Sequence, residues 1–195
     1  MKIYGDIDSG NCLKVKWTAD LLALNYDWIE TEVLKGETRT PAFLAMSPQG
    51  QVPAVDFGDG RVLAQSNGII RYLARGTALL PDDPFQQAKI DEWLFWEQNS
   101  HEFFVAGCRF QMVYLKRPKA TRDPMHVERG EKALDLMNVH LTRRAWFSGE
   151  TMTIADIALL AYTRVAHEGG FDLGTRPHVR AWIARCEAAL KLQPA

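Results

Sequence analysis

The spacing of hydrophobic positions changes several times in the first third of the chain. Residues 2–5 and 26–33 are short runs of strand type, and residues 11–24 between them carry apolar side chains at helical spacing. A further short helix is predicted over residues 40–46, because Thr40-Pro41 supplies an N-cap followed by proline at the first helical position. The pattern therefore predicts a β-α-β unit followed by a helix.

Two more strands and a helix are predicted after this unit. Residues 54–57 and 61–64 flank Gly58-Asp59-Gly60, a turn signal that predicts a β-hairpin. The next helix is predicted to begin at Ser66, since serine favours helix starts. The order βαβ-α-ββα is that of a thioredoxin-like domain, so the N-terminal part is predicted to be α/β.

The rest of the chain has helical periodicity only. Residues 76–85 contain two prolines and two aspartates and are predicted to be a linker. Thr153 is followed three residues later by Asp156, a relative of the capping box that marks a helix start. The predicted helices cover residues 88–115, 127–146, 153–168 and 177–192. We therefore predict two domains, a thioredoxin-like domain over residues 1–76 and an all-α helical bundle over residues 86–195.

Composition narrows the classes of partner. The 195 residues are 47% hydrophobic and 24% charged, with a net charge of -1, which is typical of a soluble globular protein. This charge gives no attraction to nucleic acid or to an anionic membrane, so neither is expected as a partner. The three cysteines are far apart, which favours a reducing, cytoplasmic location. The five histidines show no metal-ligand spacing, so we expect no metal, and each histidine should be exposed or hydrogen-bonded.

The segment Gly50-Gln51-Val52-Pro53 before the hairpin has an unusual backbone. Proline has no N–H and cannot donate in a central ladder, so a cis Val52–Pro53 bond is expected where the strand begins. Such a bend leaves the N–H and C=O of Val52 facing outward, where they can pair with an extended peptide. Gln65-Ser66 then opens a helix whose free N–H groups favour an anion. Together the two features predict a site for a peptide that carries a carboxylate.

Three motifs carry a resemblance to a known family. They are Ser47-Pro48-Gln49-Gly50-Gln51-Val52-Pro53, Gln65-Ser66-Asn67 and Thr153-x-Ala155-Asp156. In this order and spacing, and over essentially the whole chain, the sequence resembles the glutathione S-transferase superfamily of the bacterial serine or Nu-like type. The resemblance implies a thioredoxin-like domain that binds glutathione as co-substrate, a helical domain, a small electrophile as second substrate, and a homodimer. Ser47 stands where members carry asparagine, which keeps the chemistry of the turn.

The chemistry of this family needs the thiolate of glutathione, although a free thiol has a pKa near ~8.5. A hydroxyl that donates to the sulfur at the positive end of a helix favours the thiolate. The resemblance assigns this role first to Ser9, for which a simple N-cap is the structural alternative. Asn11 comes second, because Ser9-x-Asn11 is similar to the arrangement of Nu-like members. Cys12 comes third, since Leu13-Lys14-Val15 follows it and it is expected to point into the packing.

The resemblance also implies how glutathione is bound. It assigns the peptide backbone to Val52 and Pro53, the γ-glutamyl carboxylate to Gln65 and Ser66, and the glycine carboxylate to Arg39 and Gln51. Structural alternatives stay open, because Gln65-Ser66 can be a helix cap only, and Arg39 and Gln51 can be ordinary surface residues. Conjugation of glutathione to small electrophiles is the first functional hypothesis. A glutathione-dependent disulfide reductase or peroxidase, and a non-catalytic binding module, are the alternatives.

Overall fold

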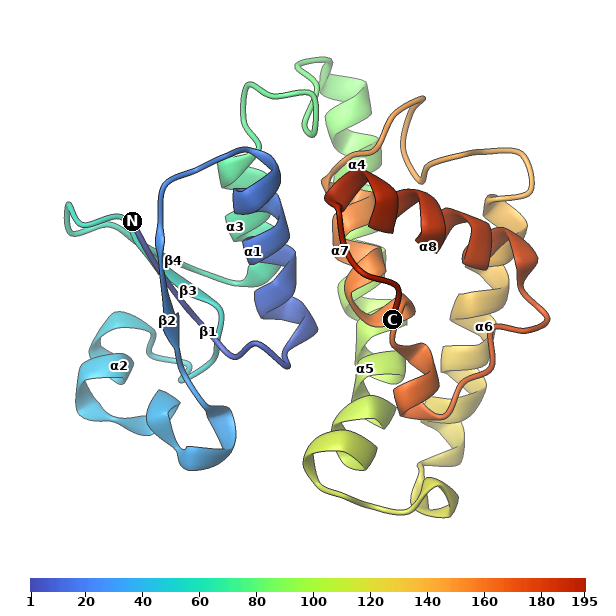
Figure 1. The fold of residues 1–195 in the computed structure, drawn as a ribbon, viewed down its shortest axis with the longest axis horizontal. Helices are drawn as coiled ribbons and strands as arrows, with labels where there is room; N and C mark the ends of the chain where they lie inside the picture. Colours follow the sequence, from blue (N-terminus) through green and yellow to red (C-terminus); the bar gives the residue numbers. More distant parts are fainter. The chain divides into compact units, whose positions relative to one another are not determined.

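The computed structural model describes residues 1–195, which divide into two compact units, Met1–Thr77 and Ala78–Ala195. The first unit holds all the strands and the second is helical throughout (Figure 1). In chain order the first unit contains β1 (Lys2–Gly5), α1 (Gly10–Leu21), β2 (Asp27–Glu30), the 3-10 turns Val33–Lys35 and Glu37–Arg39, α2 (Pro41–Met46), β3 (Ala54–Asp56), β4 (Val62–Ala64) and α3 (Ser66–Leu73). This order confirms the predicted thioredoxin-like domain.

The sheet of the first unit has the strand order β2-β1-β3-β4. β1 pairs in parallel with β2 and antiparallel with β3, so Ile3 lies between Trp28 and Val55. Helices α1 and α3 lie side by side along the strands, and α2 lies on the other side of them (Figure 1). Ile3, Val15, Val55 and Ile69 are fully buried and form the centre of this core. Because α1 and α3 pack on this core, the first turns of both helices lie at the same end of the sheet.

The second predicted strand is shorter than expected. β2 ends at Glu30 instead of residue 33, because its neighbour β1 ends at Gly5, the partner of Glu30 in the ladder. Beyond that point the backbone N–H of Glu32 donates to the carboxylate of Glu37 at 2.7 Å, which turns the chain into a 3-10 helix. The prediction was too long because the apolar pattern continues beyond Glu30, where β2 no longer has a partner strand.

The second unit is an all-α domain, as predicted. Its helices are α4 (Pro84–Trp96), α5 (Phe103–Arg109), α6 (Pro124–His140), α7 (Ile154–Thr163) and α8 (Pro177–Leu190), with π-helical turns at Glu97–Glu102 and Phe110–Tyr114 and 3-10 turns at Lys119–Thr121 and Ala166–Gly169. Every residue of α7 is buried, so α7 is the central helix of this unit. None of the helices is long and apolar enough to cross a membrane.

Several helix boundaries differ from the prediction, and three of the differences have a clear physical reason. α4 begins at Pro84 instead of residue 88, because the side chain of Asp83 caps it by accepting from the N–H of Gln86 at 2.8 Å. α6 ends at His140 instead of residue 146, since the chain folds back and stacks the buried ring of Phe147 on the imidazole of His140. α7 ends at Thr163, and the predicted continuation to residue 168 is a 3-10 turn.

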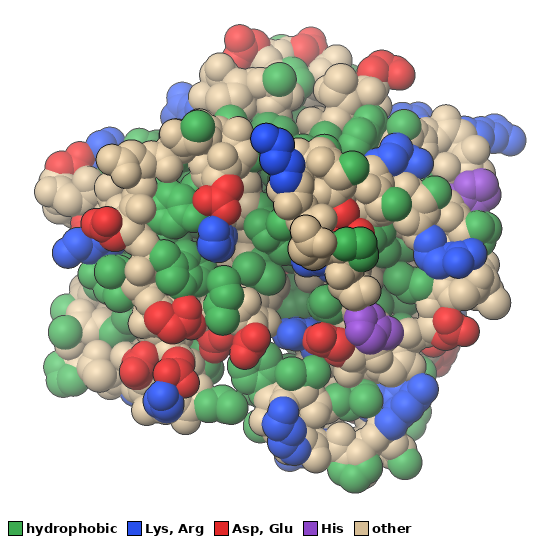
Figure 2. Space-filling model, viewed as in Figure 1, with side chains coloured by type: hydrophobic (Ala, Val, Ile, Leu, Met, Phe, Trp, Pro, Cys, Tyr) green, Lys and Arg blue, Asp and Glu red, His purple; other side chains and the backbone are tan.

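Two of the histidines are exposed, His167 and His178, and two others are hydrogen-bonded through Nε2. His101 Nε2 lies 3.0 Å from the hydroxyl of Thr163, and His140 Nε2 lies 3.2 Å from the carbonyl of Phe147. His126 is half-buried, and its Nδ1 has no hydrogen-bond partner. The ring packs edge-on against two phenylalanines, which offer no polar atom to it. Figure 2 shows positive and negative side chains interspersed on one face of the molecule, in keeping with the net charge of -1.

Candidate active site

The start of α3 has an uncommon backbone conformation. Gln65, directly before the helix, has φ 70 and ψ 109, values that a residue with a side chain rarely adopts, and its side chain does not cap the helix. Ser66 follows it and is 5% exposed. Its hydroxyl donates to Oδ1 of Asn11 at 2.9 Å, although 55 positions separate the two residues. This hydrogen bond joins the first turn of α3 to the first turn of α1, where both helices present their positive ends.

The loop between α2 and β3 is the second part of the candidate site. The Val52–Pro53 peptide bond is cis, as predicted. The ladder between β3 and β4 begins with the pair Ala54 and Ala64, so Val52 precedes the sheet by two residues. An added extended peptide needs backbone groups outside the ladder, and Val52 has this placement.

Gln49, in the same loop, was not predicted as a site residue from the sequence. Its Oε1 accepts from Nε2 of Gln65 at 2.8 Å, and its backbone carbonyl accepts from Nη1 of Arg39 at 3.3 Å. Gly50 makes room for this guanidinium, because it has φ +61 and a Cβ at that position would lie 2.5 Å from Nη1 of Arg39. Gln49 and Gln51 are the same residue type in one motif, and no local signal distinguishes their roles.

Ser9 directly precedes α1 but does not cap it. It has the extended conformation of an N-cap residue, with φ -84 and ψ 118, yet its side chain makes no capping hydrogen bond. Cys12 is fully buried, and this burial raises the pKa of its thiol from 9.0 to about 12, although a hydrogen bond from Ser9 partly opposes the rise. Cys12 therefore lies in the packing as expected, as a neutral thiol to which the Ser9 hydroxyl is bonded.

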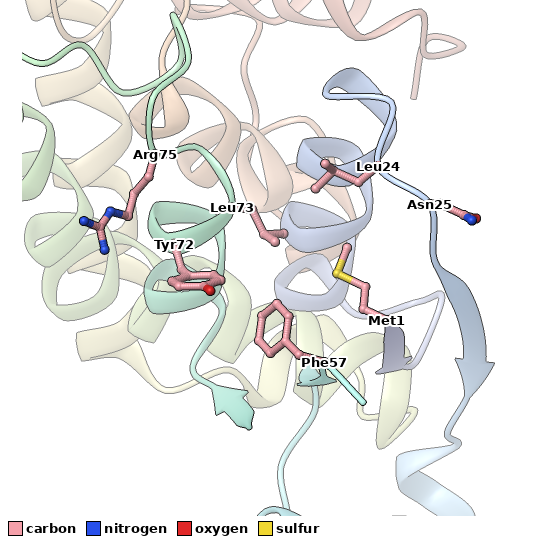
Figure 3. A pocket seen from close by; sticks show the side chains of 7 residues that line it. All are labelled: Met1, Leu24, Asn25, Phe57, Tyr72, Leu73 and Arg75. Atoms are coloured by element: carbon pink, nitrogen blue, oxygen red, sulfur yellow. The ribbon is translucent and has the colours of Figure 1, made fainter. Parts of the chain in front are cut away.

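The first unit also has a surface pocket with a different character (Figure 3). It is lined by Met1, Leu24, Asn25, Phe57, Tyr72, Leu73 and Arg75. Leu24 and Asn25 come from the segment after α1, and Tyr72 and Leu73 come from the end of α3. The pocket therefore lies away from Ser66, at the other end of α3. Figure 3 shows that the side chains of Asn25 and Arg75 point away from the apolar middle. A ligand site usually has a few converging polar groups, and this pocket does not show such a set.

Comparisons with known proteins identify the family of the chain. The N-terminal domain of the glutathione S-transferase family matches residues 8–75, and the C-terminal domain of that family matches residues 105–189. Glutathione S-transferase 3 from Zea mays is 34% identical, over 93% of this chain and 86% of its own length. The chain belongs to the glutathione S-transferase family.

Solved structures of glutathione S-transferases are also similar. One from Pseudomonas fluorescens is 44% identical with a TM-score of 0.92, over 96% of this chain and 94% of that chain. A possible glutathione S-transferase from Rhodopseudomonas palustris is 39% identical with a TM-score of 0.93, over 99% and 98% of the two chains. A theta-class enzyme from Xanthomonas axonopodis pv. citri, solved with glutathione bound, is 29% identical over 97% of this chain and 94% of its own, with a TM-score of 0.86.

In this member of the glutathione S-transferase family, some predicted site residues are hydrogen-bonded to each other directly, and others only through a third residue. Asn11 and Ser66 are bonded to each other directly. Gln65 and Arg39 are connected only through Gln49. Gln51 is held by its backbone carbonyl, which accepts from the hydroxyl of Ser47 at 3.4 Å. No group of histidine, cysteine, aspartate and glutamate side chains is arranged to hold a metal ion.

Proposed function

We propose that this chain is a cytoplasmic enzyme that conjugates the thiolate of glutathione to small electrophiles. The observation that carries the proposal is the hydrogen bond between Asn11 and Ser66, which holds the polar first turns of α1 and α3 next to each other. Two positive helix ends in one place suit a ligand that carries both a carboxylate and a thiolate. The relative from Xanthomonas axonopodis that was solved with glutathione bound adds support.

In the proposed complex the tripeptide follows the order of these segments. Ser66 and Gln65 bind the γ-glutamyl end at the start of α3, where the uncapped helix favours its carboxylate. The backbone of Val52, next to Pro53, pairs with the central cysteine residue as an added strand does. Arg39 and Gln51 face the glycine carboxylate, and Arg39 brings the positive charge for that end.

The proposed chemistry depends on the start of α1. The Ser9 hydroxyl exchanges its bond to Cys12 for one to the glutathione sulfur, with Asn11 as a second polar contact. Both contacts and the helix end favour the thiolate over the thiol. The thiolate then attacks an electrophilic carbon, a C–S bond forms, and the leaving group departs with its bonding electrons. Ser9 and Asn11 are the residues to which we assign catalysis.

A glutathione-dependent disulfide reductase or peroxidase is the second candidate. The ground for this candidate is the Ser9-x-Asn11 arrangement, which is similar to that of Nu-like members. Asn11 is bonded to Ser66 at the start of α3, whereas the Ser9 hydroxyl is engaged with Cys12. In this reaction the glutathione thiolate attacks one sulfur of a disulfide, a mixed disulfide forms, and the other sulfur leaves as a thiolate. The same binding residues serve both reactions, so the substrate assay has to separate them.

The test begins with retention on immobilised glutathione, followed by assays with a chlorinated aromatic compound and with a small disulfide. Ser9→Ala should raise the thiol pKa of bound glutathione by about one unit, because one charge-assisted hydrogen bond is lost and is partly replaced by Asn11 or water. The absorbance of the thiolate as a function of pH measures this pKa.

Cys12→Ala is the matched control and should leave turnover nearly unchanged. If Cys12→Ala abolishes turnover and Ser9→Ala does not, the enzyme uses a cysteine and our assignment is wrong. Retention on glutathione without turnover of either substrate would instead identify a binding module.

We also propose a homodimer. Phe85 and Phe95 on α4 are 73% and 75% exposed, which is unusual for large aromatic side chains and suits an interface. We expect α3 and the helical segment that contains Phe95 to form the contact across a two-fold axis. Sedimentation at micromolar concentration should give twice the 22.1 kDa of the chain, and a species of 22.1 kDa alone would refute the dimer.

A further inference from the structure

Gln49 contacts two residues that the proposed function assigns to opposite ends of glutathione. Its side chain accepts from Nε2 of Gln65 at 2.8 Å, at the γ-glutamyl end. Its backbone carbonyl accepts from Nη1 of Arg39 at 3.3 Å, at the glycine end. The two contacts use different parts of the residue, so a change of the side chain removes the first and keeps the second.

Gln65 has a particular need for such a partner. Its side chain is exposed and does not cap α3, so the helix does not fix its rotamer. A free glutamine side chain loses much of its rotamer freedom when it binds a ligand, and this loss weakens binding. A hydrogen bond that selects one orientation beforehand reduces that cost. The backbone of Gln65 is already fixed in a rare conformation, which leaves the carboxamide as the mobile part.

We propose that Gln49 is a positioning residue, which holds the carboxamide of Gln65 in the orientation that receives the γ-glutamyl end of glutathione. The inference rests on the proposed function. Gln49 is in the loop between α2 and β3, so it lies close to the backbone of Val52 in sequence and to Gln65 in space. Its side chain thereby links the part of the site that pairs with the peptide to the part that binds its amino-acid end.

Gln49→Met is the variant of choice, because methionine keeps the length of the side chain and removes the hydrogen bond. Calorimetry with glutathione and with γ-glutamylcysteine, which lacks the glycine, should show affinity reduced about 3- to 10-fold for both ligands, as the loss of one hydrogen bond predicts. KM for glutathione should rise by the same factor, while kcat at saturation and the thiol pKa of bound glutathione should not move. Arg39→Ala is the matched control and should weaken glutathione only.

A double-mutant cycle separates positioning from a general effect on the loop. Gln65→Met should weaken binding, and adding Gln49→Met to it should cost nothing further, since the two residues act through one contact. Unchanged affinity of Gln49→Met, or losses of affinity that add in the double variant, would overturn this inference and leave the proposed function standing. If the unaltered chain binds neither ligand, the proposed function fails and the inference fails with it. Coincident thermal unfolding of all variants shows that the comparison is between folded proteins.

Discussion

Helices α7 and α3 both begin with a hydroxyl residue near the first turn, but they begin in opposite ways. At α7 the side chains of Thr153 and Asp156 form a full capping box, and both residues are buried. At α3 the side chain of Gln65 makes no cap, and the hydroxyl of Ser66 donates away from the helix to Asn11. The difference separates a helix start that is capped by its own side chains from one that has no side-chain cap.

The capped start is part of a larger buried network. One carboxylate oxygen of Asp156 accepts from the N–H of Thr153 at 2.9 Å. The other accepts from the N–H of Phe147 at 3.0 Å and from the indole of Trp182 at 2.9 Å. Asp156 thus connects the loop after α6 and helix α8 to the central helix. Because these donors all face one carboxylate, the network is structural and has no group left for chemistry.

The largest expected effect is on this network. Asp156→Ala should lower the free energy of unfolding by about 3 kcal/mol or more, since it removes the cap and leaves several buried donors without an acceptor. Urea denaturation followed by circular dichroism measures the change. Glu150→Ala, at an exposed position just before the capping box, should stay within about 0.5 kcal/mol of the unaltered chain. A loss below about 1 kcal/mol for Asp156→Ala would mean that the network is not important for stability.

The same comparison explains what could be predicted from the sequence. The start of α7 was predictable because a capping box is a local pattern over four residues. The strands, the hairpin and the order of elements were also predictable, since each has its own period or turn signal. The end of α6 was not, because it depends on the stacking of Phe147 on His140, a contact between residues that the helical pattern does not relate.

The candidate site shows the same limit. Ser66 and Asn11 were each singled out from motifs, but their hydrogen bond spans the whole first unit and has no local signature. Gln49 was missed because its role comes from a contact with Gln65, and one glutamine in the loop is like another in sequence. Local patterns therefore singled out the segments of the candidate site, whereas the pairing of side chains between these segments required the fold.

The second-largest expected effect is on glutathione binding at the start of α3, which has no side-chain cap. Ser66→Ala should weaken glutathione binding by about 1–3 kcal/mol, because in the proposed complex the Ser66 hydroxyl turns from Asn11 to the charged end of the ligand, and this donor is lost. Thr153→Ala is the matched control, since it removes a hydroxyl at the capped start of α7. We expect it to lower stability by about 1 kcal/mol and to leave the glutathione affinity unchanged. Calorimetry that gave the two variants equal affinities would show that Ser66 has only a structural role.

The smallest effect tests the start of α1, which is neither capped nor open, because the Ser9 hydroxyl is bonded to buried Cys12. Burial raises the pKa of Cys12 from 9.0 to about 12, so the unfolded chain ionises first as the pH rises. The resulting stability is fully present below pH 9 and is lost above it, by about 1.4 kcal/mol at pH 10.

Cys12→Ala removes this titration. The difference in unfolding free energy between this variant and the unaltered chain should therefore change by about 1.4 kcal/mol between pH 8 and pH 10. Urea denaturation at both pH values measures the difference, and other alkaline groups cancel because both chains carry them. Parallel stability curves would mean that Cys12 ionises in the folded chain as easily as in the unfolded one. The thiol would then be accessible as a thiolate, and the assignment of Cys12 to the packing would be wrong.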